Sequence, residues 1–291
     1  MRVSAVVLSW NGREDTLSCL RSLAGEGIDV IVVDNASEDG SAEAVEREFP
    51  AVEVILNDRN LGYAGGMNVG IRRALERGAE HVLLLNNDVE LEPGAVAALL
   101  AEAEGAGAVC PLITFSHDPE TVWFAGASFD PRCGYNGRQQ GFGRPASSFT
   151  DVSETDRACG AAMLVTRSAL DAVGLLDEDL FAYQEDTDWS LRARQAGFPL
   201  RVAPAARVRH KVSAATGGEG SETALYYSTR NTLEVSERHA PLGSVDTWRR
   251  RAVILLAHTA QAALGRRPSG LQAVARGWSD FRGRRFGPRP K

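Results

Sequence analysis

Three carboxylates stand within four residues, in a segment of residues 181–192 whose pattern predicts the start of a helix. They are Glu185, Asp186 and Asp188, and the aromatic residues Phe181, Tyr183 and Trp189 flank them. The dipole of a helix favours negative charge at its N-terminus, which explains part of the cluster. It does not explain the aromatic frame, and a partly desolvated carboxylate has the raised basicity of a general base. We therefore predict general-base chemistry in this segment.

The first 104 residues predict the scaffold that positions such a cluster. Buried strands are expected at residues 3–9, 28–33, 52–56 and 81–85, and helices at 14–23, 42–49, 61–77 and 93–104. Strands that alternate with helices at this spacing form a mainly parallel sheet covered on both faces. Ligands bind beyond the carboxyl ends of the strands in such a sheet, so the polar residues there are candidates for a binding site.

Asp34 ends the second predicted strand, and two explanations of it stay open. It accepts a hydrogen bond from a pyrimidine N3–H, or it caps a turn. A third explanation is the acid that holds a ribose in dinucleotide-binding oxidoreductases. That class is excluded, because residues 10–13 lack the G-x-G-x-x-G sequence that lets the backbone approach a pyrophosphate. A P-loop is absent as well.

Residues 60–68 join the third strand to a helix and contain three glycines and two asparagines. Gly65 and Gly66 free the backbone for close approach of a ligand, and N–H groups at a helix start suit a diphosphate. Asn60 and Asn68 flank them as further candidates for nucleotide binding. Turn geometry alone is the alternative explanation for the glycines.

The fourth predicted strand ends in Asn86, Asn87 and Asp88. A carboxylate at this edge is well placed to hold Mg²⁺ or Mn²⁺ against phosphates. An Asp-type turn before Pro93 is the alternative. The residues at this strand end thus predict a divalent cation beside a diphosphate.

The chain has 291 residues, and its apolar fraction is ordinary for a globular protein. The composition therefore predicts a globular protein. No signal peptide is expected, and no apolar run approaches the roughly 20 residues needed to span a bilayer. The four cysteines are scattered and form no CxxC pair, which favours reduced thiols in a cytoplasmic protein and argues against a zinc site.

The net charge of −6 conceals an asymmetry. The chain has 32 basic and 38 acidic residues, and eleven of the basic residues but only one of the acidic residues lie in residues 249–291. Residues 1–248 therefore contain 21 basic and 37 acidic residues, a net charge of −16. An acidic body with a basic tail is not the profile of a nucleic-acid-binding protein.

The tail is predicted to be helical and amphipathic, with Leu271, Val274, Trp278 and Phe281 on one face. One possibility is that such a helix binds anionic lipid, so that residues 249–291 make a peripheral contact with the inner face of the plasma membrane. The other is that it docks on the acidic body. Both remain open.

These motifs, in this order, resemble the family-2 glycosyltransferases of the GT-A fold, and within them the rhamnosyltransferase-like subgroup. The matching segments are residues 10–12, 33–41, 60–68, 86–88, 160–167, 181–192 and 226–231, and together they span roughly residues 3–235. The resemblance implies one GT-A domain over residues 1–240, with a nucleotide-binding half at 1–106 and an acceptor and catalytic half at 107–240. Residues 241–291 are then a basic helical extension.

The resemblance also implies an inverting transfer of a sugar to an acceptor hydroxyl. The donor is a nucleoside diphosphate sugar of the dTDP, UDP or GDP type, and L-rhamnose is the sugar that the subgroup suggests. The acceptor is a glycan, a lipid-linked saccharide or a small-molecule glycoside. A non-catalytic nucleotide-sugar or glycan-binding protein on the same fold is the alternative, because Asn86 stands where the family's D-x-D motif begins with an acid.

By the resemblance, Asp186 is the catalytic base, Asp34 contacts the nucleobase, and Asp88 with His210 holds the metal. Glu185 and Asp188 orient hydroxyl groups, and Trp189 and Tyr183 contact the sugar or acceptor. Trp189 is equally explained as a core residue, and Arg192 as an i,i+4 partner of Asp188. The remaining nucleotide-binding candidates are Asn11, Asn60, Gly65, Gly66, Asn68, Asn87 and Arg230. Arg230 either meets a phosphate or packs its helix, and residues 213–221 form either a lid over the donor or a passive linker.

Overall fold

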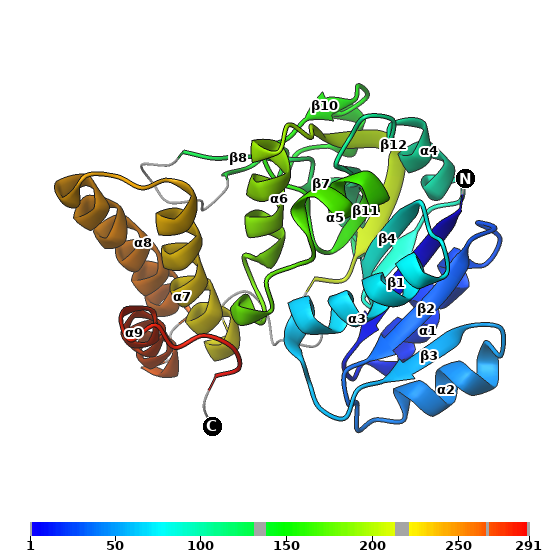
Figure 1. The fold of residues 1–291 in the computed structure, drawn as a ribbon, viewed down its shortest axis with the longest axis horizontal. Helices are drawn as coiled ribbons and strands as arrows, with labels where there is room; N and C mark the ends of the chain where they lie inside the picture. Colours follow the sequence, from blue (N-terminus) through cyan, green and yellow to red (C-terminus); the bar gives the residue numbers. More distant parts are fainter. Residues whose placement is uncertain (1, 131–137, 213–220, 266–267, 290–291) are drawn as a thin grey trace.

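The computed structural model describes residues 2–130, 138–212, 221–265 and 268–289. A large sheet with helices on it makes up the main body, and the helices α7 to α9 stand to one side of it (Figure 1). Of the predicted lid at residues 213–221, residues 213–220 lie outside the described part of the chain.

The first half of the sheet follows the predicted pattern. Its strands are β1 (Val3–Ser9), β2 (Asp29–Asp34), β3 (Glu53–Leu56) and β4 (His81–Asn86), and its helices are α1 (Arg13–Leu23), α2 (Ser41–Glu48) and α3 (Gly62–Glu76). The order is β3-β2-β1-β4 and each of these pairings is parallel. Apolar runs such as residues 5–7 and 31–33 are almost wholly buried, because strands of a parallel sheet are covered on both faces.

The second half of the sheet is mixed. It contains β5 (Val89–Leu91), β6 (Ala108–Phe115), β7 (Asp118–Phe124), β10 (Ser153–Glu154), β11 (Ala162–Thr166) and β12 (Leu200–His210). Strand β11 lies antiparallel between β4 and β6, and β12 is parallel to β6. The small strands β8 (Ala127–Ser128) and β9 (Arg138–Gln139) pair separately. The parallel prediction thus holds for β1 to β4, and the strands beyond them pair mostly antiparallel.

Three helices accompany this half of the sheet, and three more form a separate packed unit. The first group is α4 (Ala95–Ala101), α5 (Arg167–Val173) and α6 (Glu185–Gln195). The second is α7 (Glu222–His239), α8 (Ser244–Leu264) and α9 (Pro268–Arg282). Helix α6 lies between the sheet and α7, so it links the two groups (Figure 1). None of the described helices is both long and apolar enough to cross a membrane.

The glycines of α3 serve close packing between the helix and the sheet. A Cβ atom on Gly66 would lie 2.4 Å from Cδ1 of Leu8, and one on Gly70 would lie 2.2 Å from Cγ1 of Val6. Gly65 likewise leaves room for the side chain of Leu61. Gly65 and Gly66 thus have a packing role that only a residue without Cβ fills, and their approach to a diphosphate stays a prediction.

The tail docks on the body through the helix face that the sequence analysis considered for lipid. Val274 and Phe281 of α9 are buried against α7 and α8 and Trp278 is partly buried, so most of this face is not free for a membrane, although Leu271 is 45% exposed. Arg284 pairs with Glu234 of α7, and Arg251 of α8 pairs with Glu237. For α9, the docked alternative is the correct one.

Candidate active site

The carboxyl ends of the parallel strands bring predicted ligand-binding residues to one edge of the sheet. The parallel register aligns the ends of β1, β2 and β4, so Asp34 and Asn86 lie at the same edge. Strand β12 pairs antiparallel with β5, with His210 opposite Val89, which places the imidazole beside the turn that carries Asp88.

Asp34 uses its two carboxylate oxygens differently. Its Oδ1 accepts a 2.7 Å hydrogen bond from the backbone N–H of Ser37, which is the turn cap that the sequence allowed. Its Oδ2 is buried and makes no hydrogen bond to the described residues. The carboxylate therefore holds the turn and keeps one acceptor that the described protein does not use.

Two asparagine amides shape the loop between β1 and α1. Asn11 has a positive φ of 58°, and its Oδ1 accepts a hydrogen bond of 3.0 Å from the N–H of Glu38. Nδ2 of Asn87 donates to the carbonyl of Asn11 and to Oγ1 of Thr16, each at 3.0 Å. These amides thus link the strand ends of the nucleotide-binding half to one another.

The two asparagines of the glycine-rich segment have different roles. Oδ1 of Asn60 accepts from the N–H of Gly62 at 2.7 Å and so caps the turn into α3. Asn68 is buried, and its amide exchanges hydrogen bonds of 2.9 and 3.1 Å with the backbone of Leu176. The prediction of a nucleotide contact by Asn68 is wrong, because its polar atoms hold the segment that leads to α6.

Asp88 and His210 form a buried pair. Nε2 of His210 lies 3.2 Å from Oδ1 of Asp88, and the edge of the His210 ring meets Trp123 with ring centroids 4.5 Å apart. Neither imidazole nitrogen makes a hydrogen bond to a described residue. The described residues contain no group of three or more His, Cys, Asp and Glu side chains arranged around a metal. The pair therefore fits a divalent cation only in a shell that donor phosphates complete.

The loop before α6 is held in an unusual conformation by α7. Phe181, Tyr183 and Gln184 all have positive φ, between 64° and 75°, which costs free energy for residues with a side chain. Nδ2 of Asn231 offsets this cost by donating to the carbonyls of Leu180, Ala182 and Tyr183 at 2.8–2.9 Å. Helix α7 thus fixes the direction in which α6 begins.

Arg230 supports the same loop. Its guanidinium is fully buried and donates to the carbonyls of Gly287, Leu180 and Asp179 at 2.8, 3.0 and 3.3 Å. The ring centroids of Tyr226, Tyr227 and Phe286 lie within 5.0–5.5 Å of it. The prediction of a phosphate contact by Arg230 is therefore wrong, because the protein already surrounds this cation.

Glu185 is the first of the three clustered carboxylates, and it is buried. Desolvation, and then the neighbouring charge of Asp186, raise the pKa of Glu185 well above its ordinary range. Its Oε2 makes no hydrogen bond to the described residues. At neutral pH these surroundings favour the protonated form, which is a poor general base.

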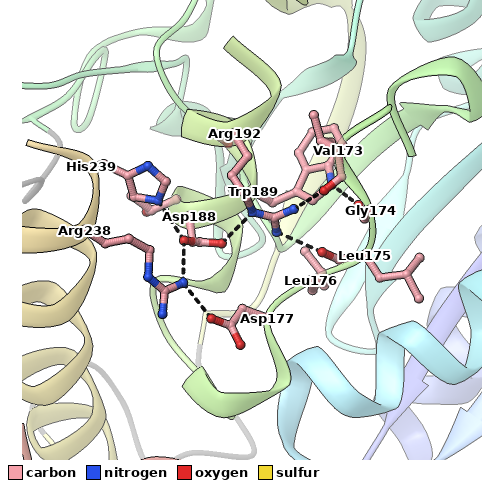
Figure 2. Close-up of polar contacts among 12 residues, drawn as sticks. Val173, Gly174, Leu175, Leu176, Asp177, Asp188, Trp189, Arg192, Arg238 and His239 are labelled. Atoms are coloured by element: carbon pink, nitrogen blue, oxygen red, sulfur yellow. Dashed lines mark hydrogen bonds and ion pairs between the residues drawn. The ribbon is translucent and has the colours of Figure 1, made fainter. Parts of the chain in front are cut away.

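Asp188 is fully buried and surrounded by cations (Figure 2). Its Oδ2 accepts from Nε of Arg192 at 2.8 Å, the i,i+4 pair that the sequence predicted. Its Oδ1 lies 2.8 Å from Nε2 of His239 and 3.0 Å from Nη1 of Arg238, both at the end of α7. Burial raises the pKa of Asp188, but the hydrogen bonds from His239 and Arg192 and the charge of Arg238 bring it down to about 2. The prediction that Asp188 orients substrate hydroxyls is wrong, since both oxygens are already engaged.

Asp186 remains as the partly exposed carboxylate of the three. Its Oδ2 accepts from the N–H of Gly160 at 3.1 Å, and its Oδ1 accepts from the N–H of Thr187 at 2.6 Å. The carbonyl of Gly160 in turn accepts a hydrogen bond from the hydroxyl of Tyr63, at the start of α3. An oriented and accessible carboxylate is what a general base requires.

Neither Trp189 nor Tyr183 presents an exposed aromatic face on which a sugar ring could stack. Trp189 is only 1% exposed and its Nε1 donates to the carbonyl of Gly174 at 2.9 Å, as Figure 2 shows. A buried ring presents no face to a sugar, so Trp189 is a core residue. Tyr183 is half-buried and packs against the apolar cluster of α7 to α9.

Sequence reasoning missed Tyr63, Gly160, Arg238 and His239 as residues that act on the carboxylate cluster. Tyr63 and Gly160 stand within the recognised segments 60–68 and 160–167, so their place in a motif was the available signal. Arg238 and His239 gave none, because their contacts with Asp188 connect positions 50 and 51 residues apart.

The structure combines a sheet whose strand ends carry a nucleotide-type site with an oriented carboxylate and a His–Asp pair. This combination defines a nucleotide-sugar-dependent glycosyltransferase of the GT-A fold. The sequence pattern of glycosyl transferase family 2 matches residues 4–174, and the chain belongs to that family. The non-catalytic alternative from the sequence analysis is thereby set aside.

Two characterised relatives are similar over most of their length. The N-acetylglucosaminyl-diphospho-decaprenol L-rhamnosyltransferase of Mycobacterium tuberculosis is 29% identical over 75% of this chain and 78% of its own. A dTDP-rhamnosyl transferase of Shigella flexneri is 24% identical over 82% of each chain.

Solved structures at low identity share the fold. S. aureus TarS has a TM-score of 0.58 at 18% identity, over 97% of this chain and 80% of the TarS fragment. GalNAc-T7 with UDP, GalNAc and Mn²⁺ has a TM-score of 0.61 at 16% identity, over 87% of this chain. This chain spans 54% of that GalNAc-T7 chain, or about half.

Replacing Asp188 by Asn tests the ion cluster at α6. We expect the free energy of unfolding at pH 7 to fall by about 2 kcal/mol, because the change removes the fully buried charge to which the partly exposed Arg192 and Arg238 donate hydrogen bonds. The folded-state pKa is depressed, so the stabilisation is present above the unfolded pKa of about 3.9 and is lost as the pH falls toward 2. Urea unfolding should therefore show the gap between wild type and Asp188→Asn closing below about pH 4.

Asp171→Asn is the matched control, because Asp171 forms an exposed i,i+4 pair with Arg167 on α5. Its loss should change stability by less than about 0.5 kcal/mol. A gap between wild type and Asp188→Asn that stays constant from pH 7 to pH 2 would contradict the assignment.

Tyr63 is expected to position Asp186 through the Gly160 peptide. Tyr63→Phe removes the hydroxyl that holds the Gly160 carbonyl, so the N–H that orients Asp186 is less well fixed. We expect kcat for release of nucleoside diphosphate to fall about tenfold with the donor KM little changed.

Tyr227→Phe is the control, since its hydroxyl also makes a hydrogen bond to the backbone, here by accepting from the N–H of Arg289 in the α7 to α9 unit. It should leave kcat unchanged. An equal loss of kcat in both variants would indicate a general structural effect rather than positioning of Asp186.

Proposed function

We propose that this protein transfers L-rhamnose from dTDP-L-rhamnose to a hydroxyl of a polyprenyl-diphosphate-linked glycan, with inversion at the anomeric carbon. The single observation that carries the mechanism is the separation of the three carboxylates on α6. Glu185 is buried and kept protonated, Asp188 is buried among cations, and Asp186 alone is partly exposed and oriented. Asp186 is thus the group that removes the acceptor proton as the acceptor oxygen attacks.

The choice of donor and acceptor rests on the relatives. The mycobacterial relative is named for an acceptor with a decaprenyl diphosphate, and the Shigella relative for a dTDP-rhamnosyl donor. The unused Oδ2 of Asp34 suits the N3–H of a thymine or uracil ring, whereas guanine presents its own N–H groups in a different arrangement. Asn11, Asn60 and Asn87 shape the loops on which the nucleotide then lies.

A divalent cation, Mg²⁺ or Mn²⁺, would be held by Asp88 and His210 together with the donor diphosphate. When bound, it would offset the negative charge that builds on the leaving diphosphate. The related fold of GalNAc-T7 was solved with UDP and Mn²⁺, which supports this part of the proposal. Asn86 replaces the first acid of the D-x-D motif, so the protein contributes fewer charges to the cation than that motif does.

Thermal unfolding with dTDP, UDP and GDP, each with and without Mn²⁺, tests the donor site. We expect dTDP with Mn²⁺ to raise Tm by roughly 5–10 °C at 100 times its dissociation constant, where binding adds about 2.7 kcal/mol. Asp88→Ala should abolish most of the shift. Asp171→Ala, which removes an exposed carboxylate on α5, should retain it.

Two outcomes would count against the proposal. A larger shift with GDP than with dTDP would reject the pyrimidine donor. A dTDP shift that is equal with and without Mn²⁺, and equal in Asp88→Ala, would reject the Asp88–His210 cation site while leaving the nucleotide site in place.

A further inference from the structure

Helix α8 exposes an apolar face that no described residue covers. Its inner side, with Arg250, Ile254, His258 and Ala262, is buried against the rest of the helical unit. Its outer side carries Val253, Leu256, Ala257, Ala260, Ala263 and Leu264, all of them exposed. We call these six residues the α8 apolar face. Leu256 and Leu264 are 69% and 83% exposed, which is unusual for leucines that lie two turns apart on one helix.

This face has no charged residue among its exposed positions between 252 and 264. The spacing of Val253, Leu256, Ala260 and Leu264 follows one stripe of the helix, so the exposure is continuous rather than scattered. In Figure 1, α8 lies on the side of the helical unit away from the sheet. A continuous exposed apolar surface of this kind favours contact with a binding partner.

Aromatic and basic side chains border the face at the start of α8. Trp248 is 57% exposed, and its ring centroid lies 6.4 Å from that of Trp278 on α9. Arg251 stands 4.8 Å from the Trp248 ring, and Arg282 stands 5.8 Å from the Trp278 ring. The side chain of Arg249 is 77% exposed. Tryptophan beside arginine at the edge of an apolar surface is typical of the boundary between lipid headgroups and acyl chains.

Charge decides between a lipid surface and a second copy of the chain. Residues 249–291 carry eleven basic residues and one acidic residue, while residues 1–248 carry a net charge of −16. Arg251, Arg284 and Arg289 pair with glutamates of α7, and Arg249, Arg276 and Arg282 are exposed. A symmetric dimer through the α8 apolar face would bring two basic segments together, which like-charge repulsion opposes. An anionic bilayer attracts the same segment and repels the acidic body. We infer that the α8 apolar face, with Trp248 and Arg249 at its edge, seats the protein on an anionic membrane surface.

The proposed contact lies on α8, within residues 249–291, and not on the predicted face of α9 with Leu271, Val274, Trp278 and Phe281. The apolar side of α9 packs mainly against α7 and α8, and this packing holds α8 with its outer side exposed. The inference does not depend on the acceptor or donor proposed above, because it rests only on exposure and charge.

Sedimentation of the full chain with vesicles tests the inference. We expect binding to vesicles of phosphatidylcholine with phosphatidylglycerol to be at least about tenfold stronger than to phosphatidylcholine alone, and to weaken in high salt. The double variant Leu256→Asp/Leu264→Asp should bind the anionic vesicles at least about tenfold more weakly, and Arg249→Gln should weaken binding as well. These positions are exposed, so Tm should not change.

Val152→Asp is the matched control, because Val152 is also an exposed apolar residue, 45% exposed, but lies before β10. It should bind vesicles as the wild type does. Release of nucleoside diphosphate with a water-soluble acceptor should be unchanged in all of these variants, which separates a failure of membrane binding from a failure of the proposed reaction.

Three results would overturn the inference. The first is a wild type that stays in the supernatant with both kinds of vesicle. The second is a Leu256→Asp/Leu264→Asp variant that binds the anionic vesicles as tightly as the wild type. The third is a wild-type dimer, seen by analytical ultracentrifugation, that this double variant converts to a monomer without any vesicle binding. That last result would make the face a contact between copies of the chain.

Discussion

Electrostatic repulsion among three carboxylates at the start of α6 is the constraint around which the rest of the site is arranged. The structure resolves it by giving each acid a different environment. Burial raises the pKa of Glu185, Asp188 pairs with Arg192 and Arg238 and lies 2.8 Å from Nε2 of His239, and Asp186 stays partly exposed with both oxygens oriented by backbone N–H groups. One carboxylate is thereby left accessible for the proposed role of base, without the cost of two further unpaired buried charges.

The helical unit α7 to α9 is part of this arrangement rather than an appendage. Asn231 and Arg230 hold the loop with positive φ that precedes α6, and the end of α7 supplies Arg238 and His239 as partners of Asp188. The same α7 receives α9, whose packing leaves the outer side of α8 exposed. A connected set of contacts therefore links the proposed membrane-facing helix to the proposed base.

The sequence predicted β1 to β4 and α1 to α3 nearly to the residue, because buried parallel strands and amphipathic helices leave strong local patterns. It also brought Asp88 and His210 together correctly, and it anticipated the Asp188–Arg192 pair. It failed where burial decides the role. Trp189, Asn68 and Arg230 are residue types that bind ligands, but the protein itself occupies their polar atoms. Such occupation depends on residues far apart in the chain, which no local pattern reports.

Single-turnover transfer from donor to acceptor by Asp186→Asn and Glu185→Gln would show which carboxylate of α6 is the base. With donor binding intact in both, the account predicts that Asp186→Asn lowers the transfer rate by about a thousandfold, because the general base is lost. Glu185→Gln should be affected far less, since it replaces a group that already carries its proton with a neutral one of the same shape. Wild-type transfer by Asp186→Asn, or an equal loss in Glu185→Gln, would contradict the division of roles among the three carboxylates.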